Sequence, residues 1–304
     1  MKFINKLILF IAIFGFQSVY SQDLEPRSLS SIPTGGNFLI ASYGYSIGNI
    51  LVDNSMPIDD LNSTINSAIF GYARSFKFLN KLTKFDVITS YSFANFEGIV
   101  SNIDSSTTRN GFGDPMLRLS IVLIGDETVS PKDFANREKN NFKLGVSFRI
   151  KAPLGQYDAS KLLNLGMNRW AFKAGVSASY TLWQRLIVEG QVNSWFFTEN
   201  KDFYGGSSIY QKPLMSFQLH TTYIFNQKMW GAISLGRSAL GETVLNDIGK
   251  DDNQNNSRMG VAFSYRINKS NSLKLALTSG VTTRYGSDYT SVLVVYQFMW
   301  FDKK

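Results

Sequence analysis

The chain has 304 residues, a formal net charge of +8 and no cysteine. The lack of cysteine excludes disulfide bridges, a thiolate metal site and lipidation at a leader junction. Hydrophobic residues make up 44% of the chain and aromatic residues 14%, which is compatible with a β-barrel because lipid-facing and lumen-facing residues alternate along its strands.

The first 21 residues have the order of a secretory signal peptide, with Lys2 and Lys6 ahead of an apolar run from Leu7 to Phe16. This run is too short for a membrane-spanning helix, so an uncleaved anchor is the less favoured alternative. We place cleavage after Ser21, which removes two lysines and leaves a charge of +6. Residues 22–36 are then predicted to form a periplasmic N-terminal lead on a chain exported through the secretory pathway.

Alternation of apolar and polar residues predicts strands in the rest of the chain. It is clearest where Met259, Val261 and Phe263 alternate with Gly260, Ala262 and Ser264. About twelve strands are expected, near residues 37–47, 65–76, 85–96, 114–125, 141–152, 169–182, 185–197, 213–225, 228–238, 257–268, 271–281 and 289–301. No later stretch is long enough for a membrane-spanning helix, so a membrane form must be a closed barrel. A secreted soluble β protein is the competing class.

The connections between the expected strands alternate in length. Residues 183–184, 226–227 and 268–270 are tight turns, whereas residues 153–168, 198–212 and 239–256 are long and rich in Gly, Asn, Asp and Ser. Short turns on one side and long loops outside the cell are typical of outer-membrane barrels. Residues 126–140 break this rule, so we expect either a small periplasmic helix there or an error in the strand count.

We therefore predict an all-β fold, an antiparallel transmembrane β-barrel over residues 37–304 in a Gram-negative outer membrane. Its expected partners are outer-membrane lipid, lipopolysaccharide, the barrel-insertion machinery and an unidentified small solute. Nucleic-acid binding is disfavoured because the basic residues are spread over many strands and form no compact patch.

Three segments are more specific than strand alternation. They are residues 111–115 (Gly-Phe-Gly-Asp-Pro), residues 152–170 and residues 196–206. Together they resemble the outer-membrane family labelled "putative meta-pathway of phenol degradation", whose members are often called transporters. The positions that carry the resemblance include Gly113, Asp114, Pro115, Pro153, Gly155, Tyr157, Asn164, Gly166, Asn168, Arg169 and Trp170.

The resemblance implies a barrel that lets small, aromatic or otherwise apolar molecules across the outer membrane. From the residues alone, Gly113 and Pro115 favour a structural loop that leads into a strand, because proline cannot donate to a ladder. Asp114 could cap that loop or bind a cation, but one carboxylate is too little for a metal site. No cofactor or metal site is predicted.

Basic residues opposite the apolar faces are the most suggestive chemistry. A charge facing lipid near the midplane costs about 2–4 kcal/mol, so these residues should face the lumen. They are Arg118, Lys143, Arg149, Lys151, Lys173, Arg258, Arg266 and Lys274. Asp86 and Glu189 neutralise them only in part, which leads to the hypothesis of a pore that prefers anions. The alternatives are that loop carboxylates pair with these cations, or that the cations meet lipid head groups near strand ends.

His220, the only histidine, raises the alternative of an outer-membrane lipase with a serine nucleophile. By its phase it lies with Ser216 and Gln218 on the polar face, away from lipid, so a hydrogen-bonded lumen histidine is preferred and no catalytic residue is predicted. The leading function is a channel or transporter for small molecules. A non-conducting structural or surface-binding barrel is the second possibility.

Overall fold

The computed structural model of the protein describes residues 24–51, 58–100, 102–126, 128–137 and 140–302. The predicted signal peptide and its cleavage point lie outside these residues. The strands are β1 Gly36–Leu51, β2 Ile58–Phe78, β3 Lys81–Val100, β4 Ile103–Phe112, β5 Met116–Ile124, β6 Phe142–Lys151, β7 Ala171–Leu182, β8 Leu186–Phe197, β9 Asn200–Phe203, β10 Ser207–Gln211, β11 Leu214–Ile224, β12 Met229–Leu240, β13 Thr243–Leu245, β14 Ile248–Gly249, β15 Gln254–Arg266, β16 Asn271–Thr282 and β17 Gly286–Phe301.

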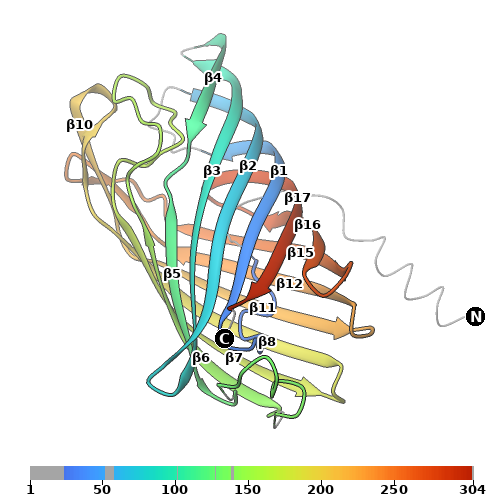
Figure 1. The fold of residues 1–304 in the computed structure, drawn as a ribbon. Coiled ribbons are helices and arrows are strands. Elements are labelled where there is room, and N and C mark those ends of the chain that lie inside the picture. Colours follow the sequence, from blue (N-terminus) through green and yellow to red (C-terminus); the bar gives the residue numbers. More distant parts are fainter. Residues whose placement is uncertain (1–23, 52–57, 101, 127, 138–139, 303–304) are drawn as a thin grey trace, which may run out of the picture.

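The long strands form a closed antiparallel barrel (Figure 1). β1 pairs with β2 on one side and with β17 on the other, and the ring closes through the pairing of β2 with β3. β4 and β5 both pair with β3, β4 along Tyr91–Val100 and β5 along Thr83–Ile88. They therefore act as two parts of one wall strand, and the wall has the twelve strands that the sequence predicts.

The outer face of the barrel is apolar, as hydrocarbon requires. On β17, Val292, Val294, Tyr296, Phe298 and Trp300 are all exposed, while the residues between them are less so. The same alternation holds on the neighbouring strands, because side chains at i and i+2 share one face of a strand. Among the described residues no helix is long and apolar enough to cross a membrane.

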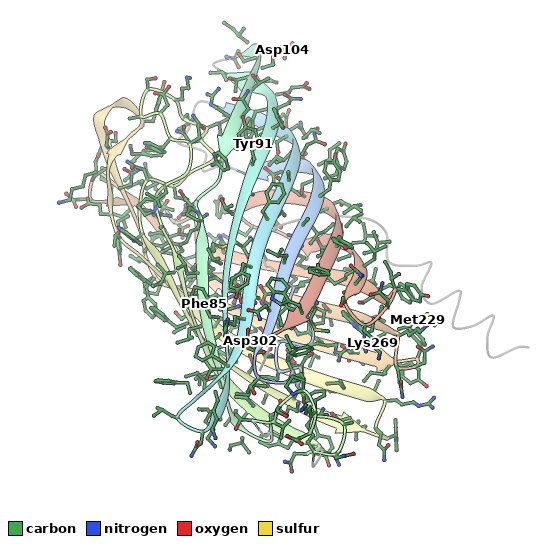
Figure 2. All side chains as sticks on the ribbon, viewed as in Figure 1. Phe85, Tyr91, Asp104, Met229, Lys269 and Asp302 are labelled. Carbon is green, nitrogen blue, oxygen red and sulfur yellow. The ribbon has the colours of Figure 1, made fainter. Side chains whose placement is uncertain are left out.

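Tight turns join the strands at the end where both β1 begins and β17 ends (Figure 1). Figure 2 labels Asp302 and Lys269 near this end and Asp104 at the far end. The long connections lie at the far end, as predicted. The segment 126–140 remains at the short-turn end. Its described residues form turns and no helix, so the expected periplasmic helix is wrong while the strand count is right.

The loops at the far end contain strands that alternation did not predict. β4 extends the wall beyond the expected strands, and β9, β10, β13 and β14 form a separate small sheet. β4 consists mainly of polar residues. It therefore carries no apolar stripe that would have marked it as a strand.

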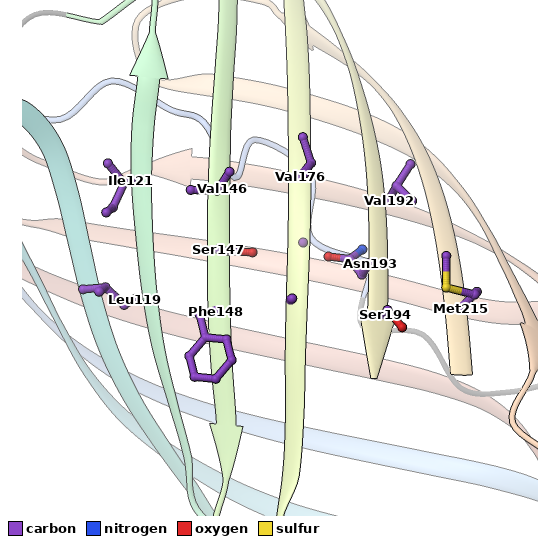
Figure 3. A pocket seen from close by; sticks show the side chains of 12 residues that line it. Leu119, Ile121, Val146, Ser147, Phe148, Val176, Val192, Asn193, Ser194 and Met215 are labelled. Carbon is purple, nitrogen blue, oxygen red and sulfur yellow. The ribbon is translucent and has the colours of Figure 1, made fainter. Parts of the chain in front are cut away.

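An apolar hollow lies on the wall formed by β5 to β8 and β11 (Figure 3). Its larger side chains include Leu119, Val146, Phe148 and Val192, all of which belong to the exposed outward-facing set. The small residues Ala174 and Gly175 lie at its base and leave the space that forms the hollow. The hollow therefore belongs to the apolar exterior of the barrel and not to a solute path through the lumen.

An arginine placed on the outward phase should destabilise the barrel much more than one placed inward at the same depth. We expect Val294→Arg to lower the free energy of unfolding by about 2–4 kcal/mol near the bilayer midplane. Leu293→Arg is the matched control, because Leu293 faces inward opposite Gly44 and Ala276. Guanidinium unfolding in lipid vesicles measures both, and equal losses would contradict the assignment of faces.

Candidate functional site: the lumen and its N-terminal lead

The described part of the N-terminal lead, residues 24–35, lies inside the barrel and touches opposite walls. The ammonium of Lys84 on β3 donates to the carbonyls of Ser28 at 3.0 Å and Ser30 at 2.6 Å. The guanidinium of Arg27 lies 5.1 Å from the ring centre of Trp230 on β12. Counted around the ring from β1, β3 is the third wall strand and β12 the ninth, so the lead bridges the lumen.

Glu189 on β8 is the main anchor of the lead. Its carboxylate accepts hydrogen bonds from the backbone N–H of Ser28 at 3.1 Å, the hydroxyl of Ser28 at 2.8 Å and the N–H of Leu29 at 3.4 Å. Glu189 is 2% exposed, and Leu29 packs with Leu82 and Val122. Charge-assisted bonds to a buried carboxylate are stronger than neutral ones, so this contact fixes the register of the lead.

Glu25 extends the same docking toward the basic wall. One of its carboxylate oxygens accepts from Arg149 at 2.6 Å, and the other accepts from Arg118. Arg118 also donates to Asp86 at 2.7 Å, and the amide of Gln191 donates to the carbonyl of Glu25 at 3.1 Å. A carboxylate supplied by the lead thus joins two cations of the wall.

These cations form a row that crosses neighbouring strands. The register pairs Asp86 on β3 with Arg118 on β5, Arg118 with Arg149 on β6, Arg149 with Lys173 on β7, and Lys173 with Trp195 on β8. The Lys173 ammonium lies 5.4 Å from the Trp195 ring centre. We call Arg118, Arg149 and Lys173 the basic row. The sequence predicts its members singly, but not their juxtaposition.

Two other predicted lumen cations contact carboxylates of the loops. Lys143 donates to the carbonyl of Leu29 and to Asp126, both at 3.3 Å. Lys151 lies 3.8 Å from a carboxylate oxygen of Asp114. For these two residues the alternative in which loop carboxylates neutralise the cations holds.

The remaining predicted cations face inward on β15 and β16. Arg258 is 6% exposed and donates to the Thr278 hydroxyl at 2.8 Å and the Tyr289 carbonyl at 3.2 Å. Lys274 and Arg266 lie on the same inward phase as Arg258. Among the cations that the sequence singles out, Arg118 and Arg149 bond to Glu25 of the lead and Lys143 bonds to the carbonyl of Leu29.

His220 is fully buried on the inner wall, opposite Glu189 in the register. One ring nitrogen lies 2.8 Å from the Ser234 hydroxyl and the other 3.1 Å from the amide oxygen of Gln218. A hydroxyl is therefore within hydrogen-bond reach, but the second partner is an amide where a lipase triad usually has an acid. The pair also lies on the face turned away from lipid, which favours a structural role.

Gly113, Asp114 and Pro115 join β4 to β5. The N–H of Gly113 donates to the carbonyl of Ser90 at 2.9 Å, and β5 starts at Met116, directly after the proline. The segment is a loop leading into a strand, as its residue types indicate. It maintains the contact with β3 across the break between β4 and β5.

Asp114 holds the β6–β7 loop, residues 152–170, against the wall. Its two carboxylate oxygens accept from the backbone N–H groups of Gly155 and Met167, each at 2.9 Å. A Cβ added at Gly155 would lie 2.7 Å from the backbone nitrogen of Asp114, and one at Gly166 would lie 2.9 Å from Gly155. Both glycines are therefore required for close approach, and Asp114 acts as an anchor for amides.

Further family positions stabilise the same loop. The amide oxygen of Asn164 accepts from the N–H of Asp158 at 2.9 Å, and the Tyr157 hydroxyl donates to the carbonyl of Asp202 at 2.8 Å. Hydrogen bonds from the side chains of Ser160 and Lys161 lower the pKa of the exposed Asp158 to about 2. The Asp158 carboxylate in this turn therefore stays ionised until the pH is strongly acidic.

The end of the loop is fixed to the next connection. The amide of Asn168 donates to Asn200 at 3.0 Å, Arg169 donates to Gln211 at 2.7 Å, and the N–H of Trp170 donates to a hydroxyl in the following loop at 3.0 Å. Leucines of the β6–β7 loop pack on the buried residues Leu61, Ala94 and Phe96. This loop therefore covers part of the inner face of β2 and β3.

The sequence places Arg118, Arg149 and Glu189 in the lumen, but it gives neither the position of the lead nor the roles of Glu25 and Lys84. Glu25 and Lys84 carried no recognisable pattern, because the lead has no periodicity and the two faces of β3 are hard to tell apart. Trp195 was visible only as part of an expected strand. Among the described residues no group of three or more His, Cys, Asp or Glu could hold a metal ion.

Comparison with known proteins identifies the family. The family model described as "Putative MetA-pathway of phenol degradation" matches residues 44–294, and the chain belongs to this family. The fold is that of an outer-membrane β-barrel. A comparison with curated proteins gives no match.

Solved structures share the barrel. The outer-membrane channel of the COG4313 group from Pseudomonas putida F1 is 19% identical, with 91% of this chain and 100% of that chain covered and a TM-score of 0.76. The translocator domain of the autotransporter NalP from Neisseria meningitidis is 12% identical, with 89% and 90% covered and a TM-score of 0.53. At these identities the similarity is one of fold.

Replacing the Glu189 carboxylate should release the lead. Because the chain has no cysteine, Ser30→Cys gives a single reporter whose reaction with a water-soluble maleimide can be timed. Glu189→Ala removes three hydrogen bonds to the lead, each worth about 1.5–3 kcal/mol because the acceptor is charged, so labelling should be at least about tenfold faster. Asp104→Ala at the far end is the control, and unchanged labelling in Glu189→Ala would contradict the anchoring role.

Removing the charge of Asp114 should loosen the β6–β7 loop. Asp114→Asn brings an NH₂ group toward two backbone donors, so we expect a local loss of about 1–3 kcal/mol. Trypsin cleavage after Lys161 measures the change in intact protein. Asp104→Asn on β4 is the control, because Asp104 is exposed and lies outside this loop. Equal cleavage of the two variants would refute the anchoring by Asp114.

Proposed function

We propose that the protein is an outer-membrane channel for small solutes whose lumen prefers anions. One observation carries the proposal. Basic residues of a closed twelve-stranded barrel lie on its inner wall, and they outnumber the wall carboxylates Asp86 and Glu189. Lumen charge tunes ion selectivity when water can pass. The channel named for the similar Pseudomonas putida structure supports the same class.

Export and location are part of this proposal. The leader is cleaved after Ser21 and the chain travels through the secretory pathway to the barrel-insertion machinery. In the outer membrane the apolar band meets lipid, and the loops at the far end face the lipopolysaccharide side. This orientation places the turns, and the point where the lead enters the barrel, on the periplasmic side.

Transport through this lumen requires the lead to move. The lead contacts β3 and β12 on opposite walls and is fixed by Glu189. We therefore expect low conductance while it is docked and a higher one when it is displaced. The family description points to phenol-related solutes, and a small aromatic solute is included among those proposed.

Planar-bilayer recording of the refolded protein tests the proposal. Deletion of residues 22–34 should raise single-channel conductance severalfold, because it removes the segment that bridges the lumen. In a KCl gradient the reversal potential should show preference for chloride. The intact barrel with Asp104→Ala serves as the control for a change that leaves the lead in place.

Two outcomes would contradict the proposal. A bilayer that stays sealed after the deletion would favour the second candidate, a non-conducting structural or surface-binding barrel. A cation-selective reversal potential would refute the anion preference while leaving the channel itself standing. We propose that the protein has no enzymatic activity, and phospholipid hydrolysis lost on His220→Ala would refute that statement.

A further inference from the structure

The basic row places three cations side by side without an obvious structural need. Arg118, Arg149 and Lys173 are successive register partners on β5, β6 and β7. Neighbouring strands lie about 5 Å apart, and like charges directly opposite each other destabilise a sheet. Asp86 reaches the end of the row at Arg118. The inner wall therefore attracts a further anion at this position.

Glu25 shows which kind of anion fits. Its carboxylate lies across the row with one oxygen on Arg118 and the other on Arg149, and the charge of Lys173 also acts on it. The Arg149 side chain is 6% exposed and that of Arg118 25%. A planar group with two oxygens thus accepts a charge-assisted hydrogen bond from each of two guanidinium groups.

The anion belongs to a segment that is not part of the wall. Glu25 reaches the row from the lead, whereas Asp86 belongs to a wall strand. An aromatic surface adjoins the row, because Trp195 follows Lys173 in the register and stacks on Phe197 with ring centres 6.3 Å apart. A carboxylate with a flat apolar body would meet both parts of this surface.

We propose that the basic row is the binding site for the carboxylate of a transported aromatic acid, and that Glu25 occupies this site until the solute displaces it. This inference rests on the proposed channel function and names its solute class. Displacement exchanges one carboxylate for another, so the cations stay neutralised. Loss of the Glu25 contact removes one of the anchors of the lead, which couples solute binding to opening of the lumen.

Binding to full-length protein in detergent tests the site without requiring transport. The probe is 4-fluorobenzoate followed by fluorine NMR. Glu25→Ala vacates the row, so the probe should bind at least about tenfold more tightly than to the parent. Adding Arg149→Gln should cancel the gain. Arg266→Gln in the same background is the matched control, because Arg266 is an inward cation of β15 outside the row.

Three further arms separate the possible ligands. Fluorobenzyl alcohol has the ring without the charge and should not bind, acetate should bind more weakly than benzoate, and phosphate should not compete. Equal binding of the alcohol, competition by phosphate, or an equal effect of Arg266→Gln would each overturn the proposal. Heat-modifiable migration on gels confirms that each variant is a folded barrel.

A second readout links binding to the lead. In the Ser30→Cys reporter with an intact Glu25, benzoate should accelerate maleimide labelling several-fold, and benzyl alcohol should not. If benzoate binds the basic row but the bilayer stays sealed, the proposed channel function is contradicted and the proposed binding site is supported. If the channel conducts but benzoate neither binds nor alters labelling, the proposed binding site is contradicted and the proposed channel function is supported.

Discussion

The interior of this barrel depends on neutralising a basic wall inside a nonpolar shell. A charge in a medium of low dielectric constant is stable only with a counter-charge or a dense set of hydrogen bonds. The strands supply Asp86, the loops supply Asp114 and Asp126, and the lead supplies Glu25. The position of the lead follows from this requirement.

The contact that neutralises the basic row therefore also holds the lead across the lumen. The carboxylate that satisfies Arg118 and Arg149 belongs to the segment that joins opposite walls. Glu189 on β8, the strand next to Lys173 on β7, also holds the lead, because its carboxylate accepts hydrogen bonds from backbone N–H groups of the lead. A solute that replaces Glu25 would keep the charges balanced while weakening the plug, which is how a closed lumen can still serve as a path.

The wall itself could be predicted from the sequence because the membrane imposes a strict rule on it. Each spanning strand must place apolar residues on one face, and the twelve expected strands agree with the observed ones to within a few residues in most cases. β4 was not predicted because it consists mainly of polar residues and has no apolar face. A small helix was one of two possibilities for residues 126–140, and the described residues of that segment form turns and irregular chain.

The candidate site could be predicted only in part. Phase along a strand indicates that Arg118, Arg149 and Lys173 face inward, but it contains no information on register, so it cannot align them in one row. The docking of Glu25 depends on contacts about a hundred residues away along the chain, and a lead without periodicity gives no sign of its position. The amide-binding role of Asp114 likewise needs the fold of a distant loop.

A charge-exchange cycle tests the central claim, that the lead is held by charge compensation with the inner wall. Glu25→Arg and Arg149→Glu should each speed the labelling of a cysteine at position 30, because each places like charges together. The double variant restores an opposite-charge pair, so its labelling should return toward the slow rate of the parent, giving a coupling free energy well above zero. Strictly additive effects in the double variant would contradict the claim.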